Sequence, residues 1–163
     1  MIIFVAAHDK NYGMGSKGSL PWPLMQSDKE HLHELADGRS LVMGERTYRN
    51  YKDIREAFKT DDVTVISKSL SGLPDAKVVD SLEPIIERAK HEDLWVIGGG
   101  NIFAQLLPHA QRMYLTEIDG DFEADTDFPK YNLNEWNVVH RESHSKDAQN
   151  PYPYTFLTLK RKI

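Results

Sequence analysis

The segment of this chain most able to hold a ligand joins a short apolar run to three consecutive glycines. Residues 94–97 read Leu-Trp-Val-Ile and predict a buried strand, and the glycines at 98–100 lead into a predicted helix. Glycine lets the backbone approach a ligand closely, and the free N–H groups at a helix start attract phosphate. A glycine-rich turn without a ligand is the alternative, because the spaced G-x-G-x-x-G fingerprint is absent.

A second glycine-bearing segment lies earlier in the chain. Residues 13–19 contain three glycines and two serines, and residues 20–23 that follow read Leu-Pro-Trp-Pro. A flexible stretch beside a rigid Pro-Trp-Pro predicts a mobile lid with one anchored end, and a large aromatic such as Trp22 often lines a pocket. The competing interpretation is an ordinary surface loop.

Asp28 follows the earlier glycine-bearing segment closely and is a carboxylate that could do chemistry. It lies near the start of a predicted helix, and Leu32 lies one turn further along the same face. If that face points inward, the carboxylate is partly buried and needs a partner that a ligand could supply. From the helix alone, a water-exposed capping aspartate is favoured over this reading. Burial and helix-start N–H groups shift the pKa in opposite directions, so no net direction is predicted.

Two further pairs place a cation and a hydroxyl just after predicted strands. Arg46 and Thr47 follow Gly44, and Ser67 and Lys68 follow a short apolar run. Both pairs suit the phosphate groups of a cofactor, although either pair alone is more often solvated loop charge.

No metal site is predicted. The seven histidines are scattered, and His31 and His33 are two apart on a predicted helix, so they face different ways. Residues 123–127 are rich in carboxylates but lack the spacing and glycine of a calcium loop, which predicts a turn between strands.

The bulk composition narrows the class of protein. A chain of 163 residues with 40% apolar content can bury a substantial core. The net charge of −5 argues against binding to nucleic acid or an anionic membrane, and the chain has no cysteine. The apolar start ends after seven residues, so we expect no signal peptide, no membrane span and a cytoplasmic location.

Short β-rich runs alternate with helical patterns along the first two-thirds of the chain. We expect strands at residues 2–7, 40–43, 63–66, 76–79, 94–97, 113–118, 136–142 and 154–159. Helices are expected at 27–37, weakly at 47–58, after Ser81 as N-cap, and at 101–107. This order predicts an α/β fold with a mainly parallel sheet, helices on both faces, and antiparallel last strands at one edge. Ligands bind at strand carboxyl ends in such sheets, which points to Ala7, Gly44, Ser67 and Gly98.

Together these segments make the chain closely resemble the dihydrofolate reductase family over essentially all 163 residues. The most specific matches are Leu-Pro-Trp at 20–22 followed by Asp28, the glycines at 98–100, and Asp-Thr-Asp-Phe-Pro at 125–129. Further matches are Val-Met-Gly at 42–44, Arg-Thr-Tyr at 46–48 and Tyr-Leu-Thr at 114–116.

This resemblance implies a fold, a reaction and partners. The fold is a single domain over residues 1–163 with a central eight-stranded sheet, and the reaction is reduction of dihydrofolate to tetrahydrofolate by NADPH. Asp28, Thr116 and Trp22 are the implied catalytic residues. Asp28 would bind the pterin and aid its protonation through water, and Thr116 would support that carboxylate by a hydrogen bond. Antifolate inhibitors and a monomeric state are also implied.

The resemblance also assigns binding residues. The pterin and nicotinamide pocket would be lined by Val5, Ala7, Leu32, Tyr51 and Phe103, together with Asp28 and Thr116. The lid segment, residues 13–20, would close over the nicotinamide. The cofactor would contact Ala7, Gly15, Ser16, Lys17, Gly18, Ser19, Leu20, Arg46, Thr47, Ser67, Lys68, Ile97, Gly98, Gly99, Gly100, Asn101, Ile102, Phe103 and Gln105.

Several positions depart from the family pattern. Asp61 falls where an arginine usually binds the glutamate tail of folate, and Lys59 or Arg55 could replace it if the loop is rearranged. Otherwise we expect weaker binding of the glutamate carboxylate. Glu45 stands where many members carry arginine, and Asp80 where some carry a basic residue. Two alternatives follow: a reductase of another pterin or of a pyrimidine, and a catalytically silent nucleotide-binding relative.

Overall fold

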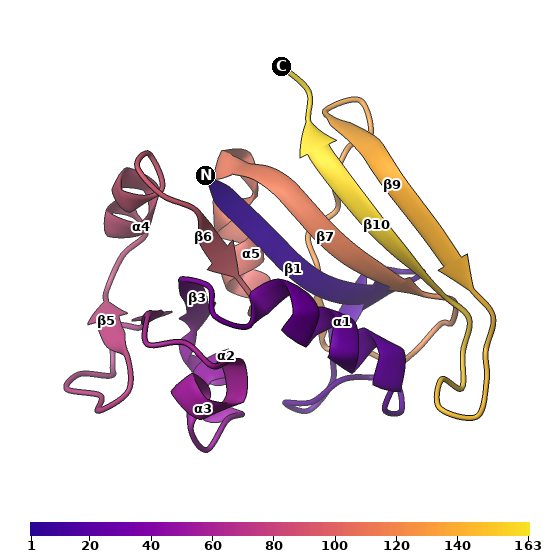
Figure 1. Ribbon diagram of the computed structural model, residues 1–163, viewed down its shortest axis with the longest axis horizontal. Helices are drawn as coiled ribbons and strands as arrows, with labels where there is room; N and C mark the ends of the chain where they lie inside the picture. The colour runs from indigo at the N-terminus through magenta and orange to yellow at the C-terminus, as the bar shows by residue number, and fades with distance from the viewer.

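A central sheet of eight strands runs through the molecule, and the computed structural model describes residues 1–163 (Figure 1). The strands are β1 (Ile2–Asp9), β3 (Leu41–Gly44), β4 (Val63–Ile66), β5 (Lys77–Val79), β6 (Leu94–Val96), β7 (Ala110–Ile118), β9 (Trp136–His144) and β10 (Tyr154–Arg161). Their order across the sheet is β5-β4-β3-β6-β1-β7-β10-β9. The first six pair in parallel, which confirms the predicted mainly parallel sheet.

The antiparallel part of the sheet lies at one edge, as predicted. The C-terminal strand β10 is antiparallel to both of its neighbours and lies between β7 and β9, so β9 is the outermost strand. The start of β9 is held by Trp136, which is buried and lies under the guanidinium of Arg161 at 4.4 Å.

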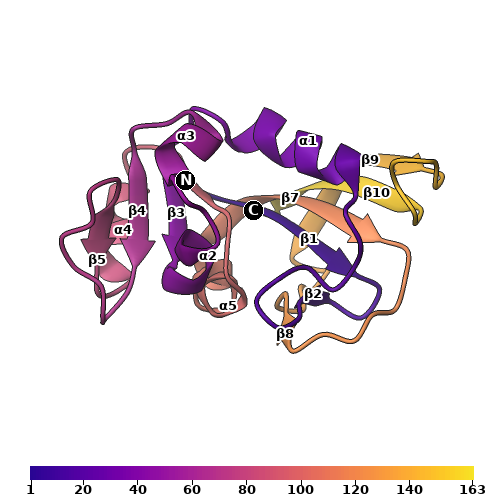
Figure 2. The ribbon, with the colours of Figure 1, turned by 90° about the horizontal axis from the view of Figure 1, so that it is seen from below.

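Helices cover both faces of the sheet, which confirms the other half of the fold prediction (Figure 2). They are α1 (Gln26–Ala36), α2 (Glu45–Arg49), α3 (Ile54–Phe58), α4 (Glu83–Arg88) and α5 (Gly100–Leu106), and a short 3-10 helix (Leu107–His109) follows α5. Helices α1 and α3 pack on one face, and α4 and α5 pack on the other. No helix in the chain combines the length and the apolar character that crossing a membrane requires.

The apolar run of β1 divides its side chains between two cores. Phe4 packs with α5 on one face, where its ring lies 4.8 Å from that of Phe103, and Ile3 and Val5 pack toward α1 and α3 on the other. Successive side chains of a strand point to opposite faces, so a strand covered on both sides must be apolar throughout.

The predicted helix boundaries need three corrections. Helix α1 begins at Gln26 with Met25 as its N-cap, so Asp28 lies inside the first turn and is not the cap. The stretch 47–58 forms two short helices, because the side chain of Asp53 accepts the N–H of Glu56 and starts α3 anew. Helix α4 is preceded by Leu82 as N-cap, and Ser81 does not cap it.

A second, two-stranded sheet was not predicted. It pairs β2 (Gly13–Gly15) with β8 (Thr126–Asp127), so the start of the lid segment and part of the expected turn at 123–127 are extended strands (Figure 2). The fully buried carboxylate of Asp9 fixes this sheet to the end of β1. It accepts the backbone N–H groups of Asn11 at 2.8 Å, Gly13 at 2.9 Å and Phe122 at 3.1 Å.

Candidate active site

A cleft of about 1500 Å³ runs along the carboxyl edge of the parallel strands. Ala7, Gly44, Ser67 and Gly98, which lie at or just after the ends of β1, β3, β4 and β6, all line it. The prediction that ligands bind at these four strand ends is therefore consistent with the shape of the molecule.

The strand order arranges the lining residues in a row. Asp28 and Thr116 belong to the end of the cleft beside β1 and β7, the glycines at 98–100 follow β6 in the middle, and Ser67 ends β4 at the far side. Neighbouring strands lie about 4.8 Å apart, so β4 lies roughly 14 Å from β1, three strands away. The cleft is long enough for an extended ligand, one end of which would contact Asp28 and the other Ser67.

The carboxyl group of Asp28 projects from α1 into this cleft and is held in a poorly solvated position. Burial raises its pKa to about 6, and the nearby hydroxyl of Thr116 offsets part of this rise. Thr116 is buried in β7, where it pairs with Ala7 of β1. The expectation of an exposed capping aspartate is wrong, because α1 starts two residues earlier and turns this side chain inward.

The raised pKa of Asp28 predicts a pH-dependent cost to stability. Between about pH 4 and pH 6 the folded protein holds a proton on Asp28 that the unfolded chain releases, so the free energy of unfolding falls as the pH rises. Ionising Asp28 should cost about 2–3 kcal/mol at neutral pH. Asp28→Asn cannot ionise, so urea denaturation should show it gaining stability over the wild type as pH rises from 4 to 7. A difference independent of pH would contradict this.

The connections after β3 and β6 approach each other so closely that they require glycine. A Cβ on Gly98 would lie 2.5 Å from Oγ1 of Thr47, and a Cβ on Gly44 would lie 3.0 Å from the side chain of Ile102. Because glycine has no side chain, the backbone at Gly44 and Gly98 lies directly at the middle of the cleft.

Gly98→Ala is expected to lower the free energy of unfolding by about 2–4 kcal/mol, because its Cβ overlaps Thr47 and its φ of 153° is unfavourable for alanine. The matched control is Gly99→Ala, whose Cβ would lie at an ordinary 3.6 Å from the same atom. Urea denaturation of both variants checks the prediction, and equal stability losses would contradict it.

The lid segment is attached to the rest of the chain at two places. Its first residues pair with β8, and the backbone N–H of Lys17 donates to the carboxylate of Asp125 at 2.8 Å. Ser16 and Ser19 bridge each other across the turn between them. Leu20 is exposed at the mouth of the cleft, so the far end of the lid segment presents an apolar side chain there.

Comparison with known proteins identifies the family. The model of the family described as dihydrofolate reductase matches residues 1–161. This chain belongs to the dihydrofolate reductase family. The dihydrofolate reductase of Bacillus subtilis (strain 168) is 33% identical over 163 residues, covering 99% of this chain and 95% of that protein. The dihydrofolate reductase of Staphylococcus aureus (strain N315) is 31% identical over 158 residues, covering 97% and 96%.

A solved structure supports both the fold and the family. The dihydrofolate reductase from Enterococcus faecalis complexed with NADP(H) and RAB-propyl superposes with a TM-score of 0.84. It is 25% identical in sequence, and the match covers 100% of this chain and 97% of that chain. Dihydrofolate reductases are oxidoreductases of one-carbon metabolism, and the α/β sheet described above is the fold of the family.

Most residues that the dihydrofolate reductase resemblance assigned to binding do line the cleft. They are Val5, Ala7, Gly15, Gly18, Ser19, Leu20, Asp28, Leu32, Arg46, Thr47, Tyr51, Ser67, Lys68, Ile97, Gly98, Gly99, Gly100, Asn101, Ile102, Gln105 and Thr116.

Four of the assigned residues do not line the cleft. Phe103 is fully buried in the core against Phe4, because it lies on the face of α5 that meets the sheet. Ser16 and Lys17 lie at the turn of the lid segment, where Lys17 has a φ of 52° and is exposed to solvent. Trp22 is buried among Met25, Ile118 and Tyr154, and its indole N–H has no protein partner.

Sequence reasoning missed other lining residues, among them Met14, Leu24, Lys29, His31 and Tyr114. Periodicity could have found two of them. His31 lies three residues after Asp28 on the same helix, and Tyr114 lies two residues before Thr116 on the same face of β7.

Residues 59–62, where the chain departs from the family pattern, and the nearby Arg55 place no cation in the cleft. Asp62 forms an ion pair with Arg88, and Arg55 donates to the backbone oxygen of Asp75 at 2.9 Å. Neither Arg55 nor Lys59 lines the cleft. The expectation that one of them replaces the missing arginine is therefore not supported, and weaker binding of a glutamate tail stays a prediction.

Proposed function

We propose that this protein reduces 7,8-dihydrofolate to 5,6,7,8-tetrahydrofolate with NADPH, and that Asp28 is the carboxylate that binds the pterin and aids its protonation. The observation that carries this proposal is a single poorly solvated carboxyl group, with a pKa of about 6, in a cleft along the carboxyl edge of the sheet. When bound, NADPH supplies the hydride.

The residues in the cleft fit such a cofactor. The backbone at Gly98 and Gly44 is bare because side chains there would overlap Thr47 and Ile102, so a phosphate-bearing chain can lie close to it. The pterin would lie at the β1 end against Val5, Leu32 and Asp28. The cofactor would extend from there past the glycines toward Ser67.

Asp28 then has two tasks that its environment suits. As an acceptor it binds the amino group and a ring N–H of the pterin, which orients the ring in the cleft. With a pKa raised to about 6 it also holds a proton more readily than an exposed aspartate, so it can help to supply the proton that the reduction consumes. Thr116 would steady the carboxylate once a ligand fills the cleft.

The lid segment would exclude water from this end of the cleft. Its anchors at β8 and Asp125 fix where it starts, while the exposed Leu20 can cover the bound ring. Within this proposal the protein acts as a monomer in the cytoplasm, and antifolates that present a pterin-like ring to Asp28 inhibit it.

The test is oxidation of NADPH followed by its near-ultraviolet absorbance, with and without dihydrofolate. Dihydrofolate-dependent oxidation supports the proposal. A folded protein that binds NADPH yet does not turn over dihydrofolate would contradict it. A reduced pterin without the glutamate tail is run in parallel, because neither Arg55 nor Lys59 lines the cleft, and this favours such substrates relative to other family members.

A further inference from the structure

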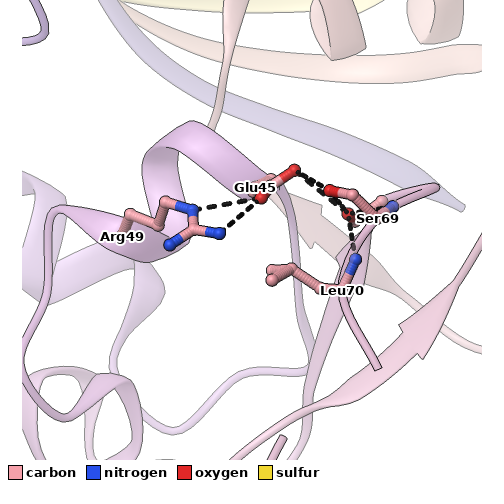
Figure 3. Close-up of polar contacts among 5 residues, drawn as sticks. Glu45, Arg49, Ser69 and Leu70 are labelled. Carbon is pink, nitrogen blue, oxygen red and sulfur yellow. Dashed lines mark hydrogen bonds and ion pairs between the residues drawn. The ribbon is translucent and has the colours of Figure 1, made fainter. Parts of the chain in front are cut away.

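The carboxylate of Glu45 lies at the far end of the cleft, where β3 gives way to α2. One of its oxygens accepts two hydrogen bonds from the guanidinium of Arg49, at 2.7 and 3.1 Å (Figure 3). The other oxygen accepts the hydroxyls of Ser67 at 3.1 Å and Ser69 at 2.9 Å. Arg49 and Ser69 lower the pKa of Glu45, so the carboxylate is ionised at neutral pH.

This network lies at the end of β4, opposite Asp28 along the row of strand ends. If the proposed function holds, the nicotinamide lies near Asp28 and the pyrophosphate near the glycines at 98–100. The adenosine ribose then reaches Glu45 and Ser67. Its 2′ position is the only point at which NADPH and NADH differ.

The groups that would bind a 2′-phosphate are already engaged. Both serine hydroxyls donate to Glu45, and the oxygen of Ser67 also accepts the backbone N–H groups of Ser69 and Leu70, at 3.1 and 3.0 Å. Arg49 is neutralised by Glu45. A carboxylate of the chain thus takes the donors that an incoming phosphate needs.

The remaining charges give no net attraction for a phosphate dianion. Arg46 and Lys68 are exposed cations that line this end of the cleft, and Asp80 and Glu83 are exposed anions that line it too. The two positive and two negative charges sum to zero, and none of the four residues forms an ion pair. In dinucleotide sites generally, an acidic residue accepts the ribose 2′-hydroxyl and an arginine accommodates a 2′-phosphate.

We propose that Glu45 sets the coenzyme preference of this protein: it accepts a hydrogen bond from a ribose 2′-hydroxyl and disfavours a 2′-phosphate. NADH is therefore a working coenzyme alongside NADPH. This inference rests on the proposed function for the identity of the ligand, and on the Glu45 network for the preference.

The kinetic test compares kcat/KM for NADPH and NADH at saturating dihydrofolate. In the wild type the two values should lie within about tenfold of each other. Glu45→Gln should raise the NADPH/NADH ratio by roughly tenfold, and Glu45→Arg by roughly a hundredfold or more. Glu87→Gln makes the same charge change on the exposed side of α4, outside the cleft, and should leave the ratio unchanged.

A binding test separates this inference from the reaction itself. Adenosine 5′-monophosphate and adenosine 2′,5′-bisphosphate are titrated calorimetrically into the wild type and both Glu45 variants, with far-ultraviolet circular dichroism as the folding check. The wild type should bind the bisphosphate no more tightly than the monophosphate, and Glu45→Arg should reverse this order. A wild type that prefers the 2′-phosphate by more than about a hundredfold, with no change in Glu45→Gln, overturns the inference while the proposed function stands. If dihydrofolate is not turned over, the fragment titrations still decide the role of Glu45.

Discussion

Asp28→Asn is expected to lower kcat/KM for dihydrofolate by roughly 10²- to 10⁴-fold, the usual range for loss of a positioned acid or base. Asparagine keeps the size and one acceptor oxygen of aspartate, so the pterin still fits, but it carries no titratable proton. Because the pKa of Asp28 is about 6, the wild-type rate of the chemical step should fall with rising pH above that value. Single-turnover rates across pH 5 to 9 should show this fall in the wild type and its loss in the variant.

The matched control is Glu30→Gln, which removes an exposed carboxylate two residues along the same helix. It should retain wild-type turnover and the wild-type pH profile. If Asp28→Asn kept turnover within tenfold of the wild type, the proton would reach the substrate by another route, and the assigned role of Asp28 would be wrong.

Asp9→Ala is expected to cost about 2–4 kcal/mol of stability, because it leaves buried backbone N–H groups without acceptors. The carboxylate of Asp9 is fully buried and accepts the N–H groups of Asn11, Gly13 and Phe122. These donors lie at the start of the lid segment and in the loop before β8. The variant should therefore also impair closure over the substrate, seen as a lower kcat at temperatures where it remains folded.

Asp121→Ala supplies the comparison. Its carboxylate is exposed and accepts only the side-chain amide of Asn11, at 2.7 Å, so its loss should cost less than about 0.5 kcal/mol. Urea denaturation of the two variants measures the contrast, and an Asp9→Ala protein as stable as Asp121→Ala would show that water replaces the lost carboxylate.

The sheet could be predicted from sequence because each strand has a local signature. Residues 2–7 of β1 are apolar on both faces, and β4 was predicted with its observed bounds from four consecutive residues of high β propensity. The small sheet of β2 and β8 has no such signature. Gly13 pairs with Asp127, and the carboxylate of Asp9 holds the backbone N–H of Gly13 in place, a contact that no local sequence pattern reveals.

The candidate site was predictable where function depends on residue type at a strand end, as at Gly98 and Ser67. It was less predictable where burial in the core decides whether a side chain lines the cleft. Phe103 and Trp22 are large apolar residues beside the two glycine-bearing segments, yet Phe103 packs against the sheet and Trp22 packs against Met25 and the strands β7 and β10, away from the cleft. The orientation of Asp28 depended on where α1 begins, and the unusual start at Gln26 without a side-chain cap gave no warning of it.

The position of β10 has a consequence for how the protein is made. Because β10 lies between β7 and β9, the sheet cannot be completed until residues 154–161 have left the ribosome. Until then β7 and β9 each present an unpaired edge, the kind of edge that joins strands from neighbouring chains. A nascent or truncated chain that lacks residues 154–161 should therefore be recovered chiefly in aggregates or bound to chaperones, while a chain that contains them is recovered folded.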